Sequence, residues 1–327
     1  MAHAHPAANP SAFPGLTLLG PEACAQALPY PALIDALGAG FGRDAADSAP
    51  RQHIDAGPGR EALLGLAWDA RGPLGLKALT LFPENPRRGL PQIQGLYALF
   101  DGGSGAPRAI LDAGTLTARR TAATAALAAR HLARTDATHL LVLGTGRLAR
   151  ALPEAFLAVR PLTRVTVWGR RPEAVATTVR DLRAHLPALA IEGARDLAAA
   201  VDACDVLTSA LPSTTPVLSS AWLKAGQHVD LIGSYRPTMA ELDGAALRRA
   251  TVFVDTAAGA WAEAGELIQA EAEGHFSRGE VAGTLGDLAS GRHPGRRGPE
   301  EITLFKAVGS AAADFYAAAL ALENAKP

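Results

Sequence analysis

The segment "VLGTGRLA", residues 142–149, has the G-x-G-x-x-G/A spacing of a turn that approaches a phosphate. Gly144 permits a sharp strand-to-helix turn, Gly146 allows close backbone approach, and Ala149 lets helix and strand pack together. The helix N-terminus adds free N–H groups for an anion. Chance matches are frequent in a chain rich in Ala and Gly, but here a strand precedes the pattern and a helix follows. We therefore predict a dinucleotide site, although Pro153 should bend or break the helix.

The end of the next expected strand indicates which dinucleotide binds. In "VTVWGRR" the strand is followed by Gly169, Arg170 and Arg171. A site for NAD usually carries Asp or Glu there, bound to the ribose 2′-hydroxyl. A carboxylate would repel a 2′-phosphate, whereas a guanidinium can bind one through two hydrogen bonds. Both arginines could instead be solvated surface residues, but their position favours NADPH, with NADH possible.

Two cations lie in surroundings that suit a bound anion. Lys77 is inside the apolar strand "LGLKALTLF", and an unpaired ammonium is unfavourable to bury, so substrate or cofactor would supply an anion. An edge-strand lysine that reaches solvent is an equally good interpretation from these residues alone. Arg120 and Thr121 are in the first turns of a long helix, where the macrodipole disfavours a cation but favours a nearby anion. By itself, Arg120 would more often be a surface residue.

Other catalytic chemistries find no support in the sequence. The 9 histidines are scattered, with no HExxH or paired CxxC pattern, so we expect no metal site. A nucleophile elbow for Ser–His–Asp chemistry is also missing. Glu263 and Glu266 are spaced i, i+3 on an expected helix, and we interpret them as surface carboxylates.

The composition excludes several classes of partner. The net charge of -1 and the pI of about 6.8 give no basic excess for a nucleic acid or an anionic membrane. No apolar run approaches the roughly 20 residues that span a bilayer, and the N-terminus lacks a signal-peptide pattern. Cys24 and Cys204 are far apart in apolar settings, which favours buried thiols over a disulfide. We expect a soluble, cytoplasmic protein.

The elements that position these residues fall into two groups. After an expected helix at 31–41, residues 65–113 form short strands separated by Gly, Pro and Asn clusters, which predicts a mostly antiparallel sheet. The expected strands are "LGLAWDA", "LGLKALTLF", "LYALFD" and "PRAILDA". Residues 114–133 follow as a long helix that Thr115 or Thr117 could cap.

Beyond this helix, strands and helices alternate, which predicts a parallel sheet covered on both faces. The expected strands are "HLLVLG", "RVTVWG", "CDVLTSA", "HVDLIGS" and "ATVFVD", and helices include "PEAVATTVRDLRAHL" and "ARDLAAAVDA". From about Glu300 the chain is expected to form one long helix that packs on the first group. The predicted fold is α/β: a Rossmann domain at 119–304, with a smaller α+β domain formed by 1–118 and 305–327.

Three segments together resemble the ornithine cyclodeaminase/mu-crystallin family. They are "RRTAATAALAARHLA" before "LGTG", then "SALPSTTPVLSSAWLKAGQHVDLIGSYRPTMAELD", and "GTLGDLASGRHPGRRGPEEITLFKAVGSAAADFYAAALA". The similarity runs from about Arg51 to the C-terminus. It implies that the smaller domain is a substrate-binding and dimerisation domain, with a homodimer built by the N-terminal sheet. It also implies a cleft in which Arg51, Lys77 and Arg120 hold an amino-acid carboxylate. In the family the arginine directly precedes the threonine, so Arg120 matches and Arg119 does not. The expected cofactor-binding residues are Thr121, Gly144, Thr145, Gly146, Arg147, Leu148, Gly169, Arg170, Arg171, Ala210, Leu211 and Gly233.

One departure narrows the expected activity. Cyclodeaminating members of the family carry an aspartate two residues after the glycine that corresponds to Gly233, where this chain has Tyr235. A phenol with a pKa of about 10 cannot replace that base at neutral pH. Members that reduce cyclic ketimines have a similar "GSxRP" segment and do not need the aspartate. Asp243, eight residues after Tyr235, is interpreted as structural.

The resemblance therefore implies NADPH-dependent reduction of Δ1-pyrroline-2-carboxylate or Δ1-piperideine-2-carboxylate, to L-proline or L-pipecolate. Lys77 is the most reasonable proton source, directly or through water. The alternatives are ornithine cyclodeamination with a different base, an alanine dehydrogenase-type activity, or a non-catalytic NADPH-dependent binding protein. Retention of the three cations together with the glycine turn favours catalysis, although the fold alone cannot decide among these activities.

Overall fold

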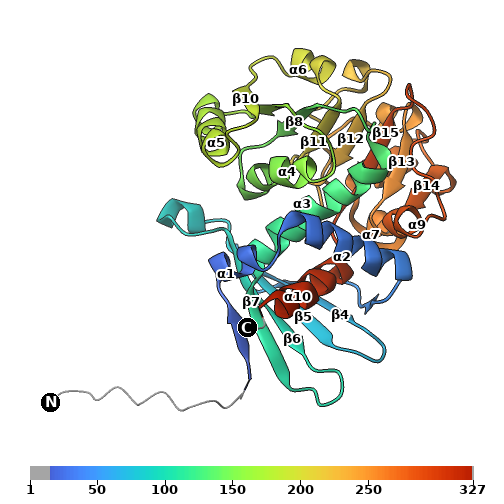
Figure 1. The fold of residues 1–327 in the computed structure, drawn as a ribbon. Helices are drawn as coiled ribbons and strands as arrows, with labels where there is room; N and C mark the ends of the chain where they lie inside the picture. Colours follow the sequence, from blue (N-terminus) through green and yellow to red (C-terminus); the bar gives the residue numbers. More distant parts are fainter. Residues whose placement is uncertain (1–14, 326–327) are drawn as a thin grey trace.

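The computed structural model describes residues 15–325. These residues form two β-sheets, and a long helix, α3 (Ala113–Leu132), contacts strands of both (Figure 1). The first sheet contains the N-terminal strands, and the second contains the strands that follow α3. The mixed α/β class expected from the sequence is confirmed.

The first sheet is mostly antiparallel, as predicted. Its strands are β1 (Thr17–Leu19), β2 (Asp47–Ser48), β3 (Gln52–Asp55), β4 (Glu61–Trp68), β5 (Leu74–Leu81), β6 (Ile93–Phe100) and β7 (Pro107–Asp112). Their order is β1-β7-β6-β5-β4-β2, with β3 also paired to β4, and β1 runs parallel to β7. Lys77 on β5 is paired with Gly65 on one side and Tyr97 on the other, so its strand lies inside the sheet.

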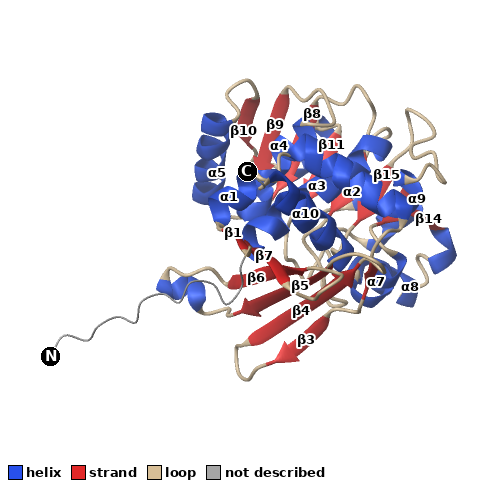
Figure 2. Ribbon diagram, turned by 60° about the horizontal axis from the view of Figure 1, so that its bottom comes forward, coloured by secondary structure: helices blue, strands red, loops and turns tan. Residues whose placement is uncertain are grey.

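Helices cover one face of this sheet (Figure 2). The helices that contact its strands are α1 (Pro21–Gln26), α3 and α10 (Ala311–Asn324), and α2 (Tyr30–Arg43) packs on α3 and α10. We call the opposite side the outer face. Strand alternation and register place on it Leu18, Ile54, Leu64, Leu66, Trp68, Leu74, Leu76, Ala78, Leu96, Ala98, Phe100 and Ile110. Leu18 is 69% exposed and Leu96 is 43% exposed. No helix among residues 15–325 covers this apolar face, whereas soluble antiparallel sheets usually turn polar residues to water.

The second sheet is parallel throughout. Its strands are β8 (His139–Leu143), β9 (Arg164–Trp168), β10 (Ala190–Gly193), β11 (Val206–Ser209), β12 (His228–Leu231), β13 (Thr251–Val254), β14 (Val281–Thr284) and β15 (Thr303–Lys306). The order is β10-β9-β8-β11-β12-β15-β13-β14. Its first five strands have the 3-2-1-4-5 arrangement of a dinucleotide-binding sheet, with the reversal of strand order between β8 and β11. Ligands of such sheets bind beyond the carboxyl ends of the strands at this reversal.

Both faces of this sheet are buried, as expected for parallel strands. Leu140 and Val142 on β8 belong to one core and Leu141 and Leu143 to the other. The remaining helices are α4 (Arg147–Leu157), α5 (Pro172–His185), α6 (Leu197–Ala203), α7 (Ala257–Glu263), α8 (Gly265–Ala272) and α9 (Leu285–Ala289). Short 3-10 helices are η1 (Asn85–Arg88), η2 (Ser220–Trp222), η3 (Gly244–Arg248) and η4 (Arg278–Glu280).

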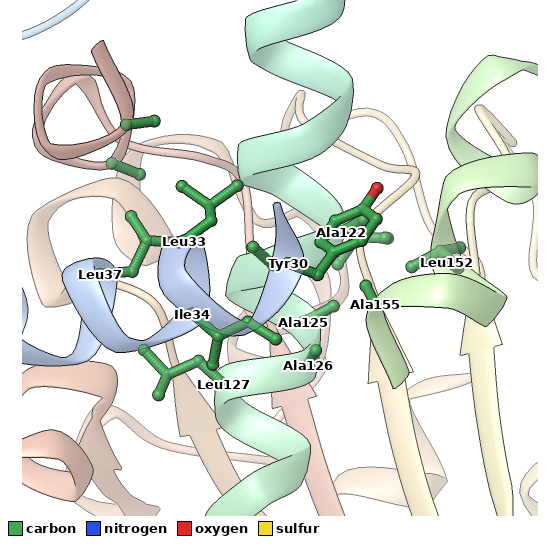
Figure 3. Close-up of a cluster of buried hydrophobic side chains, with 14 of the residues drawn as sticks. Tyr30, Leu33, Ile34, Leu37, Ala122, Ala125, Ala126, Leu127, Leu152 and Ala155 are labelled. Carbon is green, nitrogen blue, oxygen red and sulfur yellow. The ribbon is translucent and has the colours of Figure 1, made fainter. Parts of the chain in front are cut away.

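The alanine-rich helix α3 lies at the centre of the larger core. Ala122, Ala125 and Ala126 face Tyr30 of α2 and Leu152 of α4 in Figure 3. Small side chains let three helices approach closely, so α3 packs against both α2 and α4. The first turns of α3, which carry Arg120 and Thr121, therefore have a fixed position between the two sheets.

The expectation of one long helix from Glu300 is wrong. The segment instead forms β15 and then α10, separated by Gly309, whose φ of 85° suits glycine. β15 lies between β12 and β13, so its apolar side chains are buried on both faces of a parallel sheet. An apolar run of this kind cannot be assigned to strand or helix by periodicity alone.

Two details of the helices also differ from expectation. The side chain of Asp112, rather than Thr115 or Thr117, caps α3 by accepting the Thr115 N–H at 2.6 Å. Asp is one of the preferred N-cap residues, and it lies directly before the first helical residue. Helix α4 runs through Pro153 without the break that proline could have caused. The predicted domain boundaries at 118 and 304 fall inside α3 and β15, respectively.

Cys24 and Cys204 are free and buried, as predicted. Burial raises the pKa of the Cys24 thiol to about 11, so it is protonated at neutral pH. Within residues 15–325, no helix is long and apolar enough to cross a membrane, and no cluster of His, Cys, Asp and Glu could hold a metal ion.

Candidate active site

A cavity of about 1100 Å³ lies between the two sheets, at the carboxyl ends of β8, β9, β11 and β12. Arg51 and Lys77 line it from the first sheet's side, and Arg120 and Thr121 line it from α3. From the second sheet the lining includes Gly144, Thr145, Gly146, Arg147, Leu148, Gly169, Arg170, Arg171, Ala210, Leu211 and Gly233. The structure thus brings all the sequence-predicted site residues to one cavity, while their individual roles stay predictions.

The glycine turn has the geometry that a phosphate site needs. Gly144 follows β8 with a φ of 120°, a conformation that other residues rarely adopt. Gly146 is the N-cap of α4, and no side chain caps this helix end. A Cβ added at Gly146 would meet no atom within 4 Å, so space is open in front of the free N–H groups. These features fit a pyrophosphate at the helix N-terminus.

Arginines stand at the end of β9, where the cofactor's ribose would lie. Arg170 and Arg171 follow Gly169, line the cavity and are exposed. Among the residues that the structure describes, neither arginine has an ion-pair or hydrogen-bonding side-chain partner. Their guanidinium groups are therefore not engaged by the protein, which fits a phosphate ligand.

A buried carboxylate, Glu241, holds together the two loops that follow β11 and β12. It accepts the backbone N–H of Leu211 at 3.1 Å, of Gly233 at 2.8 Å and of Ser234 at 2.9 Å. A side chain at Gly233 would clash with the Leu211 backbone, so the loops approach closely only with glycine. Burial raises the pKa of the Glu241 carboxyl, and the ammonium of Lys306, 3.6 Å away, acts in the opposite direction. Sequence reasoning missed this residue.

Asp314 of α10 supplies the anion that Lys77 requires. Its Oδ2 lies 2.5 Å from Lys77 Nζ, and its Oδ1 accepts the Nε–H of Arg120 at 2.7 Å. Lys77 is 2% exposed, so the interpretation as a solvated edge-strand lysine is wrong. The sequence predicts that substrate or cofactor supplies an anion to Lys77, and in the structure a carboxylate of the protein already supplies one. Burial is the main cause that lowers the pKa of Lys77 to about 8, against the opposing effect of Asp314. Burial alone would raise the pKa of Asp314, but Arg120 and Lys77 together lower it.

Arg51 has its own carboxylate partner. Its Nε donates to Glu263 at 3.2 Å, and its Nη2 donates to the other Glu263 oxygen and to the Val308 carbonyl at 2.9 Å. Glu263 ends α7, and Glu266 belongs to α8, so the two are not on one helix as expected. Neither is a surface carboxylate: Glu263 is 17% exposed, and Glu266 is buried 3.1 Å from Lys306.

Three further residues, Arg119, Tyr235 and Asp255, lie in or near the cavity. Arg119 points away from the cavity and donates to the Leu28 carbonyl at 2.7 Å, which agrees with choosing Arg120. Tyr235 lines the cavity. Asp255, also in the lining, was missed; it accepts the N–H groups of Val308 and Gly309 at 3.1 Å and 2.7 Å. Burial raises the pKa of Asp255. Its place at the carboxyl end of the predicted strand "ATVFVD" was a usable signal.

Comparisons with known proteins find relatives of similar sequence and similar fold. A model of the ornithine cyclodeaminase/mu-crystallin family matches residues 40–327. A Delta(1)-pyrroline-2-carboxylate reductase of Paracoccus denitrificans is 39% identical over 252 residues, 76% of this chain and 78% of the relative. The structure of Thermococcus litoralis Delta(1)-pyrroline-2-carboxylate reductase, in complex with NADH and L-proline, has a TM-score of 0.90 at 27% identity, covering 94% of this chain and 97% of that chain. An archaeal alanine dehydrogenase dimer with bound NAD has a TM-score of 0.87 at 28% identity, covering 95% and 96% of the two chains.

Proposed function

Since this chain belongs to the ornithine cyclodeaminase/mu-crystallin family, we propose that it reduces cyclic ketimine carboxylates with NADPH. The substrates are Δ1-pyrroline-2-carboxylate and Δ1-piperideine-2-carboxylate, and the products are L-proline and L-pipecolate. One observation carries the proposal: Arg51, Lys77 and Arg120 line the same cavity as the glycine turn at the end of β8. A carboxylate held by the cations then lies beside the reducing cofactor.

The cofactor residues divide by the part of the dinucleotide that they suit. The free N–H groups at the start of α4 suit the pyrophosphate, and Arg170 and Arg171 suit a 2′-phosphate. The loops joined by Glu241, with Leu211 and Gly233, suit the nicotinamide end. When bound, the reduced nicotinamide supplies the hydride. Arginines in place of the acidic residue support NADPH over NADH.

The cations and Lys77 provide the remaining chemistry. Arg51 and Arg120 bind the carboxylate of the imino acid and orient its ring through charge-assisted hydrogen bonds. Lys77, with its pKa lowered to about 8 mainly by burial, is still an ammonium at neutral pH but is a stronger acid than an ordinary lysine. We assign to Lys77 Nζ the proton that the ring nitrogen takes up, directly or through one water. Hydride addition to the C=N carbon then gives the amino acid.

Tyr235 supports reduction over cyclodeamination. It lines the cavity at the position where cyclodeaminating relatives carry their aspartate. Tyrosine lacks the carboxylate that accepts a proton from the substrate amine in those relatives. Reduction of an imine needs a proton donor rather than a carboxylate base. Tyr235 in place of the aspartate therefore removes nothing that the reduction requires.

The outer face of the first sheet supports a homodimer. Its rows Leu64–Ala78–Leu96 and Leu66–Leu76–Ala98–Ile110 run across neighbouring strands and present a continuous apolar surface. Contiguous apolar surfaces of this kind usually mark protein–protein interfaces. We propose that a second copy of the chain covers this face, with the two sheets packed against each other.

The function is tested by mixing the purified protein with each imine and following absorbance loss with NADPH and with NADH. We expect oxidation of NADPH in both cases and formation of the L-amino acid. L-Ornithine with NAD, assayed for ammonia, and L-alanine with NAD serve as parallel reactions. Turnover of neither imine with either cofactor, or faster turnover of ornithine or alanine, would contradict the proposed function.

A further inference from the structure

The Arg51–Glu263 ion pair joins two distant parts of the fold. Arg51 lies between β2 and β3, in a segment without regular structure. Glu263 is the last residue of α7, the helix that follows β13 of the second sheet. The carboxylate binds the guanidinium edge formed by Nε and Nη2, and the Val308 carbonyl also accepts from Nη2. An arginine in an irregular segment thus obtains its position from the other half of the molecule.

The contact leaves part of the guanidinium free. Among residues 15–325, Nη1 of Arg51 has no hydrogen-bond partner. Arg51 lines the cavity but Glu263 does not, so the carboxylate approaches from the side away from the cavity. Glu263 is therefore placed to hold Arg51 rather than to occupy the site of a substrate carboxylate.

We propose that Glu263 is a positioning residue that fixes Arg51 with Nη1 facing the imino-acid carboxylate; this inference rests on the proposed function. An arginine side chain has several rotatable bonds, and fixing them before binding removes an entropic penalty from the binding step. A two-point contact fixes the plane of the guanidinium as well as its position. Glu263 thus acts on substrate affinity through Arg51 and does not touch the substrate.

The test is Glu263→Gln in the full-length enzyme. Glutamine has the same length, but its NH₂ group faces an Arg51 N–H, so the two-point contact is lost. We expect the KM for the imine to rise about tenfold, equivalent to about 1.4 kcal/mol, with kcat within about twofold because the contact serves ground state and transition state alike. The Kd of NADPH, measured by fluorescence without imine, should not change.

Three further variants separate positioning from other effects. Glu263→Asp keeps the charge but withdraws the carboxylate by one methylene, so positioning predicts a raised KM here too. In an Arg51→Lys background, Glu263→Gln should add nothing, because lysine cannot form the two-point contact. Glu271→Gln is the matched control: it breaks an exposed pair between Glu271 of the neighbouring helix α8 and Arg278 of η4, and neither residue lines the cavity.

Binding of pyrrole-2-carboxylate, a planar monoanion, to the cofactor-saturated enzyme gives a readout independent of turnover. Its Kd by calorimetry should rise with the KM in Glu263→Gln. An unchanged or lower KM and Kd in that variant, a wild-type KM in Glu263→Asp, or an equal change in Glu271→Gln would overturn the inference. Failure of the wild-type enzyme to reduce either imine would instead overturn the proposed function.

Discussion

Asp314→Asn tests whether one carboxylate stabilises both buried cations of the cavity, Lys77 and Arg120. Asp314 lies 2.5 Å from Lys77 Nζ and accepts the Arg120 Nε–H at 2.7 Å. All three side chains are buried. Asparagine has nearly the same shape, so packing is preserved and the change removes mainly the negative charge. Two buried cations then remain without their counter-ion.

The loss of stability follows from the uncompensated charge. Removing one partner of a buried ion pair typically destabilises a fold by about 3–5 kcal/mol. At about 2–4 °C per kcal/mol for large domains, this corresponds to a decrease in Tm of about 6–20 °C. Lys77, whose pKa is already lowered to about 8, can release its proton, so we expect the lower part of this range.

The effect should depend on pH in a defined direction. In the wild-type protein the folded-state pKa of Lys77, about 8, is below its ordinary value of 10.5, so the unfolded state binds more protons between these values and stability rises with pH there. In the variant, loss of Asp314 lowers the pKa of Lys77 further. The Tm difference between the two proteins should therefore be larger at pH 6 than at pH 9.

The same change should move the pH profile of catalysis. If Lys77 donates the proton, kcat/KM is constant below about pH 8 and falls tenfold per unit above it, because this parameter reports the free enzyme. A charge-assisted hydrogen bond contributes about 1.5–3 kcal/mol, so its loss should shift the decline by about one to two pH units toward acid. Substrate ionisation is identical in both enzymes and cancels in the comparison. An unshifted profile in a folded variant would falsify the role of Asp314 in setting the pKa of Lys77.

Three other substitutions test separate parts of the proposals. Lys77→Met should nearly abolish turnover while leaving the Kd of NADPH unchanged; full activity with either imine would exclude Lys77 as the proton source. Arg170→Asp should raise the KM for NADPH about tenfold to a hundredfold, because a charge-assisted hydrogen bond to the 2′-phosphate is lost. The same change should shift the cofactor preference toward NADH. An unchanged ratio of kcat/KM for the two cofactors would argue against a 2′-phosphate contact. Leu96→Glu on the outer face should convert the proposed dimer to monomer in light scattering, because the interface would bury an unpaired charge. Glutamate in place of the exposed Leu157 on α4 is the control, and a wild-type protein that is already monomeric contradicts the proposed interface.

Local signals explain which parts of the fold were predictable. A short continuous stretch of sequence is enough to predict three features: the glycine turn, the alternation of strands and helices, and the Ala-rich helix α3. β15 was missed because its strand character depends on insertion between β12 and β13. Nothing within "ITLFKAVG" distinguishes a doubly buried strand from a helix that begins early. The Asp112 cap was missed because two threonines one turn later are also acceptable N-cap residues.

The sequence predicted the glycine turn and the cations of the site, but not the carboxylates that pair with those cations. Lys77 indicates a nearby anion, because an unpaired ammonium is unfavourable to bury in an apolar strand. The sequence alone led us to assign this anion to a ligand. Asp314 lies far along the chain, and its carboxylate within the apolar run "AAADFYAAALA" was the available clue. The i, i+3 spacing of Glu263 and Glu266 predicts two surface carboxylates on one helix. This prediction is wrong because sequence spacing cannot show that a helix ends between them.

The backing carboxylates resolve a conflict between folding and binding. A cavity for a substrate carboxylate needs buried cations, yet buried cations without partners destabilise the empty enzyme. Asp314 and Glu263 pair with the cations, but neither lines the cavity. The empty site can therefore be stable while Nη1 of Arg51 stays available to an incoming anion. By this reasoning, carboxylates behind a cationic site determine both whether the fold tolerates the site and how strongly the site binds an acid.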